Sequence, residues 1–306
     1  MKKILFIFLL CPFLLISSDI EEIRIIFTGD IQGYLKPEYA TYMNPAFPPT
    51  IGNTGAFLNY LNKVRQHSNP ILISNGNIYT DNAFTFREKR EKVEKFLDDV
   101  NYDFINFGVF DVMMLDKDYK ETANKYKVIS SNATFNDFPI FQYRIIDYKG
   151  IKVGIFGLIS EYTKLYNQSK YWDKFNIENE LDAAQRMVNI LRMKKADLII
   201  AVTDIGDDRD KYLAQHINGI DLIIGGFLGR GINKPFENHT THTIVFRTYG
   251  NMGNIALISI FYDKEKESIV KYEAVSKTLF DYEFPISDSI IDAYGFKKIN
   301  GKWISE

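Results

Sequence analysis

Polar side chains follow several short apolar runs of the chain, at positions where they could contact a ligand. The runs IIFTGDIQG, ILISNGN and LIIAVTDIG each begin with apolar, mostly β-branched residues, and these are followed by Asp30, Asn77 and Asp204. Open α/β sheets present their ligands beyond the carboxyl ends of their strands. The sequence therefore predicts a polar site built from the segments that follow these strands.

The elements that must position these side chains alternate along the chain. Short β-branched runs alternate with longer amphipathic stretches, which is the pattern of an α/β domain. The clearest helix is expected at 180–194, where apolar residues recur on one face. After residue 240 the pattern changes to strands, and a short helix near 287–293 closes the chain. Further helices are expected at 56–66, 86–100 and 208–217, and strands at 23–28, 71–73, 104–107, 128–130, 141–147, 152–158, 197–201, 221–225, 242–248, 255–262 and 268–275.

Length and composition limit the possible functions. The chain has 306 residues, of which 46% are hydrophobic, and this is enough to bury a full core. Lys and Arg number 37 against 39 Asp and Glu, giving a formal net charge of −2. No basic run could follow a phosphate backbone, so we expect no nucleic-acid partner.

The first 18 residues have the order of a secretory signal peptide. Lys2 and Lys3 precede the apolar run 4–16, and small serines follow it. The apolar run is shorter than the ~20 residues that span a bilayer as a helix. We therefore expect export to the periplasm or cell envelope, with no transmembrane segment after cleavage. The alternative is lipidation of Cys11, but no small residue stands beside it.

Five blocks of the chain resemble those of the calcineurin-like metallophosphoesterases. They read IIFTGDIQGYLKP, ILISNGN, YDFINFGVFD, LIIAVTDIG and DLIIGGFLG, and they are most similar to the branch of 5′-nucleotidases and UDP-sugar hydrolases. The resemblance covers about 23–262 and implies a four-layer α/β sandwich of two mixed sheets flanked by helices. It implies one domain over 19–306, with strands and a short helix at 263–306. We expect no C-terminal domain of the kind that stacks the nucleoside base in 5′-nucleotidases.

In that family, polar residues of the blocks bind two metal ions about 3.5–4 Å apart. The resemblance places the first-block Asp on Asp30 and the bridging Asp on Asn77. The family's catalytic His falls on Phe110, which cannot donate a proton to a leaving group. The other ligand positions fall on Gln32, Val109, Asp204, Phe227 and Gly229.

The types of these residues disfavour catalysis. Of the seven ligand positions only Asp30 keeps its type, and every family histidine is replaced. We therefore expect no two-metal site and no metal cofactor. The leading hypothesis is an exported bacterial pseudoenzyme that binds a small ligand or a protein partner. The alternative is an active phosphoester or nucleotide hydrolase that uses one Ca²⁺, Mg²⁺ or Mn²⁺ held by oxygens of Asp30, Gln32, Asn77 and Asp204.

Two other features leave alternatives open. The Pro-rich segment 34–54 is interpreted as either a surface excursion or a lid over the site. Among the histidines, His67 and His216 are expected at helix ends as ordinary surface or capping residues. His239 and His242 are expected to enter a strand, where their spacing directs them to opposite faces. They could share a metal ion only if the chain turns there.

Overall fold

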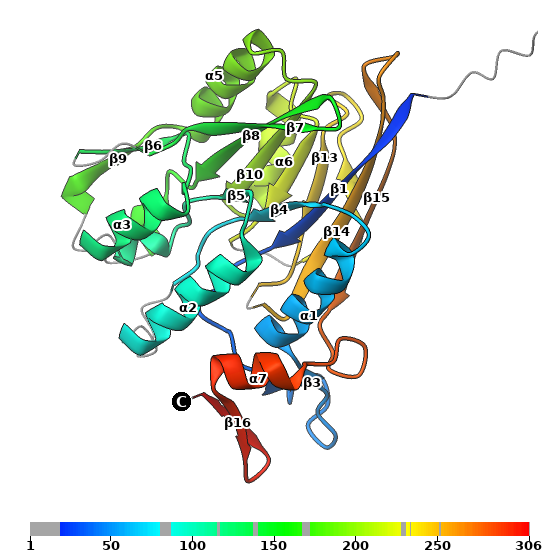
Figure 1. Cartoon of the computed structure of the whole chain (residues 1–306). Helices are drawn as coiled ribbons and strands as arrows, with labels where there is room; N and C mark the ends of the chain where they lie inside the picture. Colours follow the sequence, from blue (N-terminus) through cyan, green and yellow to red (C-terminus); the bar gives the residue numbers. More distant parts are fainter. Residues whose placement is uncertain are drawn as a thin grey trace, which may run out of the picture.

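The computed structural model describes residues 19–79, 87–114, 117–136, 140–166, 172–227, 231–232, 234–250 and 252–305 (Figure 1). The expected signal peptide, 1–18, lies outside these residues. No helix in the described part of the chain is long and apolar enough to cross a membrane.

The first large sheet is mixed and has five strands in the order β15-β14-β1-β4-β5. At its centre, β1 (Ile20–Thr28) pairs antiparallel with β14 (Asn254–Asp263) and parallel with β4 (Ile71–Ser74). The edges are β15 (Ser268–Thr278) and β5 (Phe104–Ile105). Exposed residues alternate with partly buried ones along β15, as in an antiparallel strand with one solvated face.

The second large sheet is also mixed and has six strands in the order β12-β13-β11-β10-β8-β7. Every residue of its central strand β10 is buried, as expected for a parallel strand covered on both faces. The outer pairs β12–β13 and β7–β8 are antiparallel, and the inner pairs are parallel. The strands are β7 (Tyr143–Tyr148), β8 (Ile151–Ile159), β10 (Leu198–Asp204), β11 (Leu222–Gly225), β12 (Phe236–Glu237) and β13 (Ile244–Arg247).

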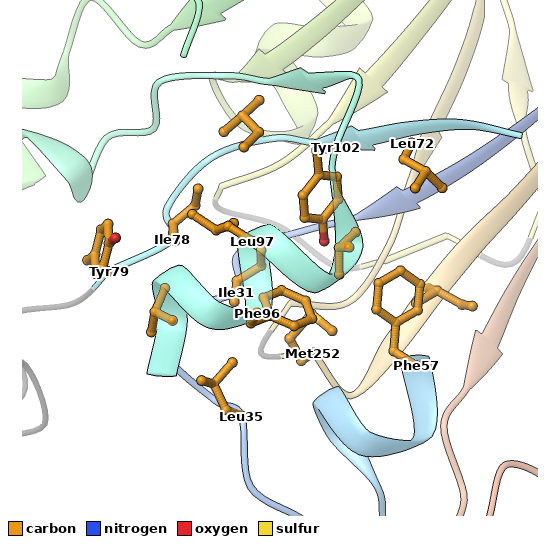
Figure 2. Close-up of a cluster of buried hydrophobic side chains, with 14 of the residues drawn as sticks. Ile31, Leu35, Phe57, Leu72, Ile78, Tyr79, Phe96, Leu97, Tyr102 and Met252 are labelled. Carbon is orange, nitrogen blue, oxygen red and sulfur yellow. The ribbon is translucent and has the colours of Figure 1, made fainter. Parts of the chain in front are cut away.

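The two sheets pack face to face, and helices cover their outer faces. Ile25 and Phe27 of β1 share one buried cluster with Ile200 and Val202 of β10. A second cluster of buried side chains lies between the first sheet and its helices. It includes Phe57 and the other residues labelled in Figure 2. A third joins the second sheet to its helices. This arrangement confirms the predicted four-layer sandwich.

Side-chain chemistry explains where the covering helices form. The helices α1 (Asn53–Arg65) and α2 (Arg87–Val100) cover the first sheet, and α7 (Asp288–Tyr294) packs against α1. The helices α5 (Glu180–Met193) and α6 (Asp207–His216) cover the second sheet. At the start of α5, the Asn179 side chain accepts hydrogen bonds from two backbone N–H groups of the first turn, which otherwise lack partners.

Several small elements were not predicted, and two predictions were wrong. Residues 128–130 form only an isolated bridge at Ile129. Strand β13 begins at Ile244, because the chain turns before it and His242 has φ 57°. The elements without a prediction are α3 (Lys117–Lys125), α4 (Thr163–Tyr166), the 3₁₀ turns Asp111–Met114 and Trp172–Lys174, and the strands β2 (Glu38–Tyr39), β3 (Thr50–Ile51), β6 (Ala133–Phe135), β9 (Phe175–Ile177), β12, β16 (Phe296–Ile299) and β17 (Lys302–Ser305).

The Pro-rich segment 34–54 contains a short hairpin of β2 (Glu38–Tyr39) and β3 (Thr50–Ile51). Between these strands, Tyr42 and Phe47 are exposed. The hairpin is tied to the C-terminal part of the chain by a bridge from Ile51 to Phe280.

Candidate functional site

Three chain segments with unusual backbone geometry converge beyond the carboxyl ends of the strands. Asp30 lies two residues after β1 and Asn77 three residues after β4, and both have positive φ (42° and 50°). Asp and Asn tolerate this left-handed region better than most residues. Phe227, two residues after β11, also has a positive φ (55°), which is strained for a bulky side chain. These bends turn the chain so that the three residues meet.

The Asn77 side chain is the centre of the site. Its amide nitrogen lies 2.5 Å from Asp30 Oδ1 and 2.9 Å from each carboxylate oxygen of Asp204. Its amide oxygen accepts a hydrogen bond of 2.8 Å from the Phe110 backbone N–H. The two carboxylates need donors and the N–H needs an acceptor, so these partners fix which way the amide points.

Asp204 is fully buried and has no cationic partner among the contacts described for it. It accepts a 2.6 Å hydrogen bond from the Val109 backbone N–H in addition to those from Asn77. Burial raises the pKa of Asp204 well above its ordinary value, and the Asp30 carboxylate raises it further. The hydrogen bonds from Val109 and Asn77 oppose this shift.

Asp111 holds the loop after β4 against the loop after β5. Its buried carboxylate accepts 2.9 Å hydrogen bonds from the backbone N–H groups of Asn77, Ile78 and Gly108. Burial raises the pKa of Asp111 to about 6, although these bonds oppose the shift. A side chain at Gly108 would place its Cβ 2.2 Å from the Asn77 amide oxygen, so this approach requires glycine.

Asn75 is a second positioning residue that the sequence interpretation missed. Its amide oxygen accepts a 2.8 Å hydrogen bond from the Asp30 N–H, and its amide nitrogen lies 3.4 Å from Asp30 Oδ1. Both Asn75 and Asp111 belong to the blocks ILISNGN and YDFINFGVFD. Their membership of these blocks was the available signal.

Two aromatic rings stand beside the carboxylates. The rings of Phe110 and Phe227 meet edge to face, with centroids 5.7 Å apart and planes at 71°. The Phe227 backbone N–H points to Asp30 Oδ2 at 3.3 Å. The rings present apolar surface, and they offer neither a lone pair to a cation nor an acidic proton.

The other predicted site positions make fewer contacts with the carboxylates. The Gln32 backbone N–H donates to the Asn77 carbonyl at 2.7 Å, and no contact of its side chain with the carboxylates is described. The Val109 side chain is buried in the core, and only its N–H reaches the site. Gly229 lies outside the described residues. The structure thus brings Asp30, Asn77 and Asp204 together by side chain.

The histidines lie away from this cluster. His216 ends α6, where its Nδ1 lies 2.8 Å from the Tyr212 carbonyl oxygen, and His67 follows α1, both as expected. His242 is exposed and lies 3.5 Å from Glu237, in the turn before β13. In the described part of the chain, no group of three or more His, Cys, Asp or Glu side chains is arranged to hold a metal ion.

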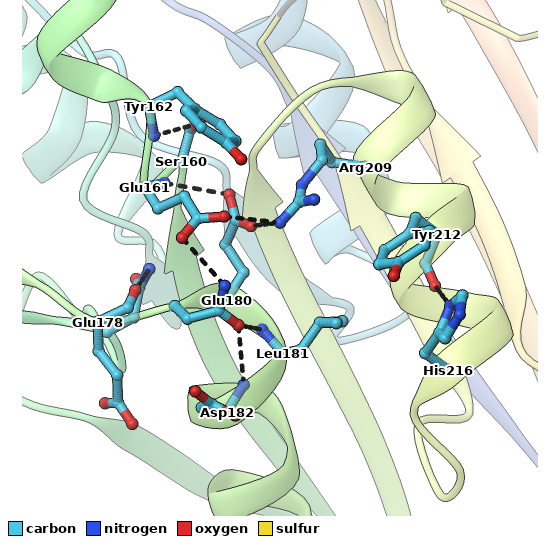
Figure 3. A network of polar contacts seen from close by, with 12 residues as sticks. Ser160, Glu161, Tyr162, Glu178, Glu180, Leu181, Asp182, Arg209, Tyr212 and His216 are labelled. Atoms are coloured by element: carbon cyan, nitrogen blue, oxygen red, sulfur yellow. Dashed lines mark hydrogen bonds and ion pairs between the residues drawn. The ribbon is translucent and has the colours of Figure 1, made fainter.

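A polar network supports the site from the side of α5 and α6. The Ser160 backbone N–H donates to the Asp204 carbonyl at 3.1 Å, which ties the ends of β8 and β10 together. Close by, Arg209 forms ion pairs with Glu161 and with the buried Glu180 (Figure 3). The Arg209 guanidinium also lies 5.7 Å and 5.5 Å from the ring centroids of two tyrosines, Tyr162 and Tyr212.

A cavity of about 350 Å³ opens from the Asp30 and Phe227 side of this cluster. The hairpin 38–51 forms one wall, and the segment after β13 forms another. The segment 34–54 therefore borders the site. The described residues lining the cavity are Asp30, Glu38, Tyr42, Ile51, Phe227, Gly231, Arg247, Thr248, Tyr249, Gly250 and Gly253.

The chain belongs to the calcineurin-like phosphoesterases, whose family profile matches residues 23–226. This match confirms the family predicted from the five blocks. The trifunctional nucleotide phosphoesterase protein of Bacillus subtilis (strain 168) is 26% identical over 226 residues, covering 60% of this chain and 15% of that protein. The snake venom 5′-nucleotidase of Gloydius brevicauda is 22% identical over 228 residues, covering 71% of this chain and 38% of that protein.

Solved structures show the same fold. A 5′-nucleotidase precursor from Thermus thermophilus superposes with a TM-score of 0.79 at 17% identity, covering 89% of this chain and 57% of that chain. The NAD nucleotidase of Haemophilus influenzae superposes with a TM-score of 0.72 at 18% identity, covering 94% and 54%. The chain therefore spans little more than half the length of these proteins.

Proposed function

We propose that this protein is a non-catalytic homologue of the 5′-nucleotidase-like phosphoesterases, retained as a binding protein. One observation carries the proposal. The Asn77 amide nitrogen lies between the Asp30 and Asp204 carboxylates, within 2.5 to 2.9 Å of their oxygens. The lone pairs that would bind cations are instead directed at N–H donors.

The residues present do not fit the two metal ions of the family. A bridging carboxylate is replaced by Asn77, whose oxygen is turned away toward the Phe110 N–H. Val109 presents an N–H, and Phe110 and Phe227 present rings. A cation at this place would face hydrogen-bond donors and apolar surface, both of which disfavour it.

The alternative is an active phosphoester or nucleotide hydrolase with one Ca²⁺, Mg²⁺ or Mn²⁺. Its support is the closeness of the Asp30 and Asp204 carboxylates, which share one donor. For Asn77 to supply its carbonyl as a ligand, the amide would have to rotate and give up the Phe110 hydrogen bond. We therefore rank this function second. A weak ion bound only by the native state would raise the unfolding midpoint in millimolar Ca²⁺ or Mg²⁺.

We also propose that the protein is exported by a bacterium, to the periplasm or cell envelope. The order of charged, apolar and small residues at the N-terminus supports export. The venom 5′-nucleotidases among its relatives are secreted, which supports export in general. Intact mass of the protein recovered from the expressing cells tests it. Export with signal cleavage predicts a chain that begins near Ser18, and an unmodified chain that retains Cys11 contradicts it. An added diacyl mass on Cys11 would favour the lipoprotein alternative.

Hydrolysis assays test the main proposal. The purified chain is incubated with nucleotides, UDP-sugars and aryl phosphates in the presence of Mn²⁺, Zn²⁺ or Co²⁺. We expect no turnover above that of the Asp30→Ala variant. Robust metal-dependent turnover that disappears in Asp30→Ala would overturn the proposal.

A further inference from the structure

The cavity beside the site has a volume and lining suited to a small organic ligand. Its volume of about 350 Å³ lies in the range of ligand pockets, which hold roughly 300–1,000 Å³. Its described lining residues come from four separate segments: the loop after β1, the hairpin 38–51, the segment after β11, and the end of β13 with the segment that follows it. The close packing of these segments gives the cavity a defined shape.

Glycines allow two of the cavity walls to approach. A Cβ at Gly231 would lie 2.4 Å from the ring of Tyr249, and a Cβ at Gly250 would lie 2.8 Å from that of Asp30. Neither contact is possible for a larger residue without movement. The two glycines therefore allow the Tyr249 ring and Asp30 to lie at the cavity wall.

Carboxylates outnumber cations among the described residues that line the cavity. The carboxylates of Asp30 and Glu38 line it, and Arg247 is the one cation among the described lining residues. Arg247 is only 2% exposed, and it is neutralised from behind by an ion pair with the buried Asp210. Its guanidinium also donates to the backbone carbonyls of Gly226 and Phe227. The positive charge of Arg247 is therefore committed to the protein itself.

Aromatic side chains add a second feature. Tyr42, Phe227 and Tyr249 line the same cavity, and the two tyrosines are 76% and 45% exposed. Faces of aromatic rings attract organic cations, and carboxylates beside them add direct charge attraction. A phosphate ester would meet the carboxylates with like charge and would find no uncommitted cation among the described lining residues.

We propose that this cavity binds a small organic ammonium ion carrying a flat apolar group, and that it excludes phosphate esters. The inference rests on the proposed function, since a metal-loaded site would reverse the charge of the cavity. The ammonium group would lie near Asp30 and Glu38, and the apolar group would contact the aromatic lining. The ligand would thus differ in charge from a phosphoester substrate.

Calorimetric titration with three matched probes tests the charge preference. The probes are phenethylammonium, the neutral 2-phenylethanol and the anionic phenyl phosphate, in a buffer with a chelator. We expect phenethylammonium to bind about ten-fold or more tightly than the alcohol, and its affinity to fall with added salt. Phenyl phosphate should not bind detectably. Equal affinity for amine and alcohol, or tighter binding of phenyl phosphate, would overturn the inference.

Two variants locate the binding. Glu38→Gln and Tyr249→Ala should each weaken phenethylammonium binding by about three- to ten-fold. The control Glu273→Gln removes an exposed carboxylate on β15 and should leave the affinity unchanged. Unchanged affinity in Glu38→Gln would contradict the cavity as the site. Metal-dependent hydrolysis would instead refute the proposed function, whereas absence of both hydrolysis and ammonium binding would refute this inference alone.

Discussion

Two buried aspartates at the same end of β10 are stabilised in different ways. Asp210, in α6, pairs with the guanidinium of Arg247 and accepts a 2.5 Å hydrogen bond from Thr203. Asp204, at the end of β10, accepts hydrogen bonds from the Asn77 amide and the Val109 backbone N–H. The second carboxylate near it, Asp30, carries like charge. The buried carboxylate of Asp210 is thus paired with a cationic side chain. At the candidate site, the buried carboxylate of Asp204 contacts neutral hydrogen-bond donors instead.

The two regions are also connected. Besides binding Asp210, Arg247 donates to the carbonyls of Gly226 and Phe227. These carbonyls belong to the bend that aims the Phe227 N–H at Asp30. The ion pair therefore positions one side of the site without taking part in it.

The largest expected effect comes from breaking the ion pair. Arg247→Leu leaves Asp210 buried without its cation and should lower the free energy of unfolding by about 3–5 kcal/mol. Urea unfolding measures this change. The double variant Arg247→Leu/Asp210→Leu removes both charges and should recover much of the loss. A loss below about 1 kcal/mol in the single variant would contradict the account of this region.

The next effect sharpens the contrast at Asn77. In metal-free buffer, Asn77→Asp removes the donor shared by Asp30 and Asp204 and adds a third carboxylate. Hydrogen bonds to charged groups contribute about 1.5–3 kcal/mol, so we expect a loss of about 2–3 kcal/mol in urea unfolding. The matched control is Asn44→Asp in an exposed turn, where a carboxylate can accept the same N–H bonds. Equal stability of the two variants would count against the role of the amide.

Asp210 contributes to the pH dependence of stability in the same direction as Asp111 and Asp204, whose pKa values burial also raises. Burial raises the pKa of Asp210 to about 7, although Arg247 opposes the shift. A raised pKa means that the folded protein binds this proton more tightly than the unfolded chain. The resulting stabilisation is full below the ordinary pKa of 3.8 and is lost as the pH rises through about 7.

Thermal unfolding midpoints should therefore fall between pH 5 and pH 8. The free energy of unfolding should fall by on the order of 1 kcal/mol per pH unit below about pH 7. In Asp210→Asn the same series should be flatter, whatever its absolute stability. Equal pH dependence in the wild type and in Asp210→Asn would contradict proton uptake by Asp210 in this range.

The smallest effect concerns the two rings at the site. A double-mutant cycle with Phe110→Leu and Phe227→Leu measures the coupling of the edge-to-face pair. We expect a coupling energy of about 0.5–1.5 kcal/mol, as is usual for aromatic pairs. Additive single effects would mean that the rings only fill space.

Much of the fold could be predicted because it depends on local pattern. The strand β10 and the helix α5 lie close to the ranges expected, since long apolar periodicity marks both. The three- and four-residue strands β6, β9, β16 and β17 depend on partners distant in sequence or on small local hairpins. Such short pairings leave too little pattern to detect.

The candidate site, like the fold, could be predicted only in part. The order of the blocks predicted that Asp30, Asn77 and Asp204 belong to one site. The direction of the Asn77 amide could not be predicted, because it depends on the N–H of Phe110, 33 residues away. Arg247 had no local signal either, since its partner Asp210 lies 37 residues away. Long-range hydrogen bonds therefore decide the chemistry of the site.

Titration of Mn²⁺ into the purified protein tests most directly whether the Asn77 amide occupies the place of the family's metal ions. Calorimetry is performed on the wild type and on Asn77→Asp after treatment with chelator. We predict no stoichiometric Mn²⁺ binding by the wild type, and binding of one ion by Asn77→Asp, in which three carboxylates would converge. Tight binding of two Mn²⁺ ions per wild-type chain would contradict the account.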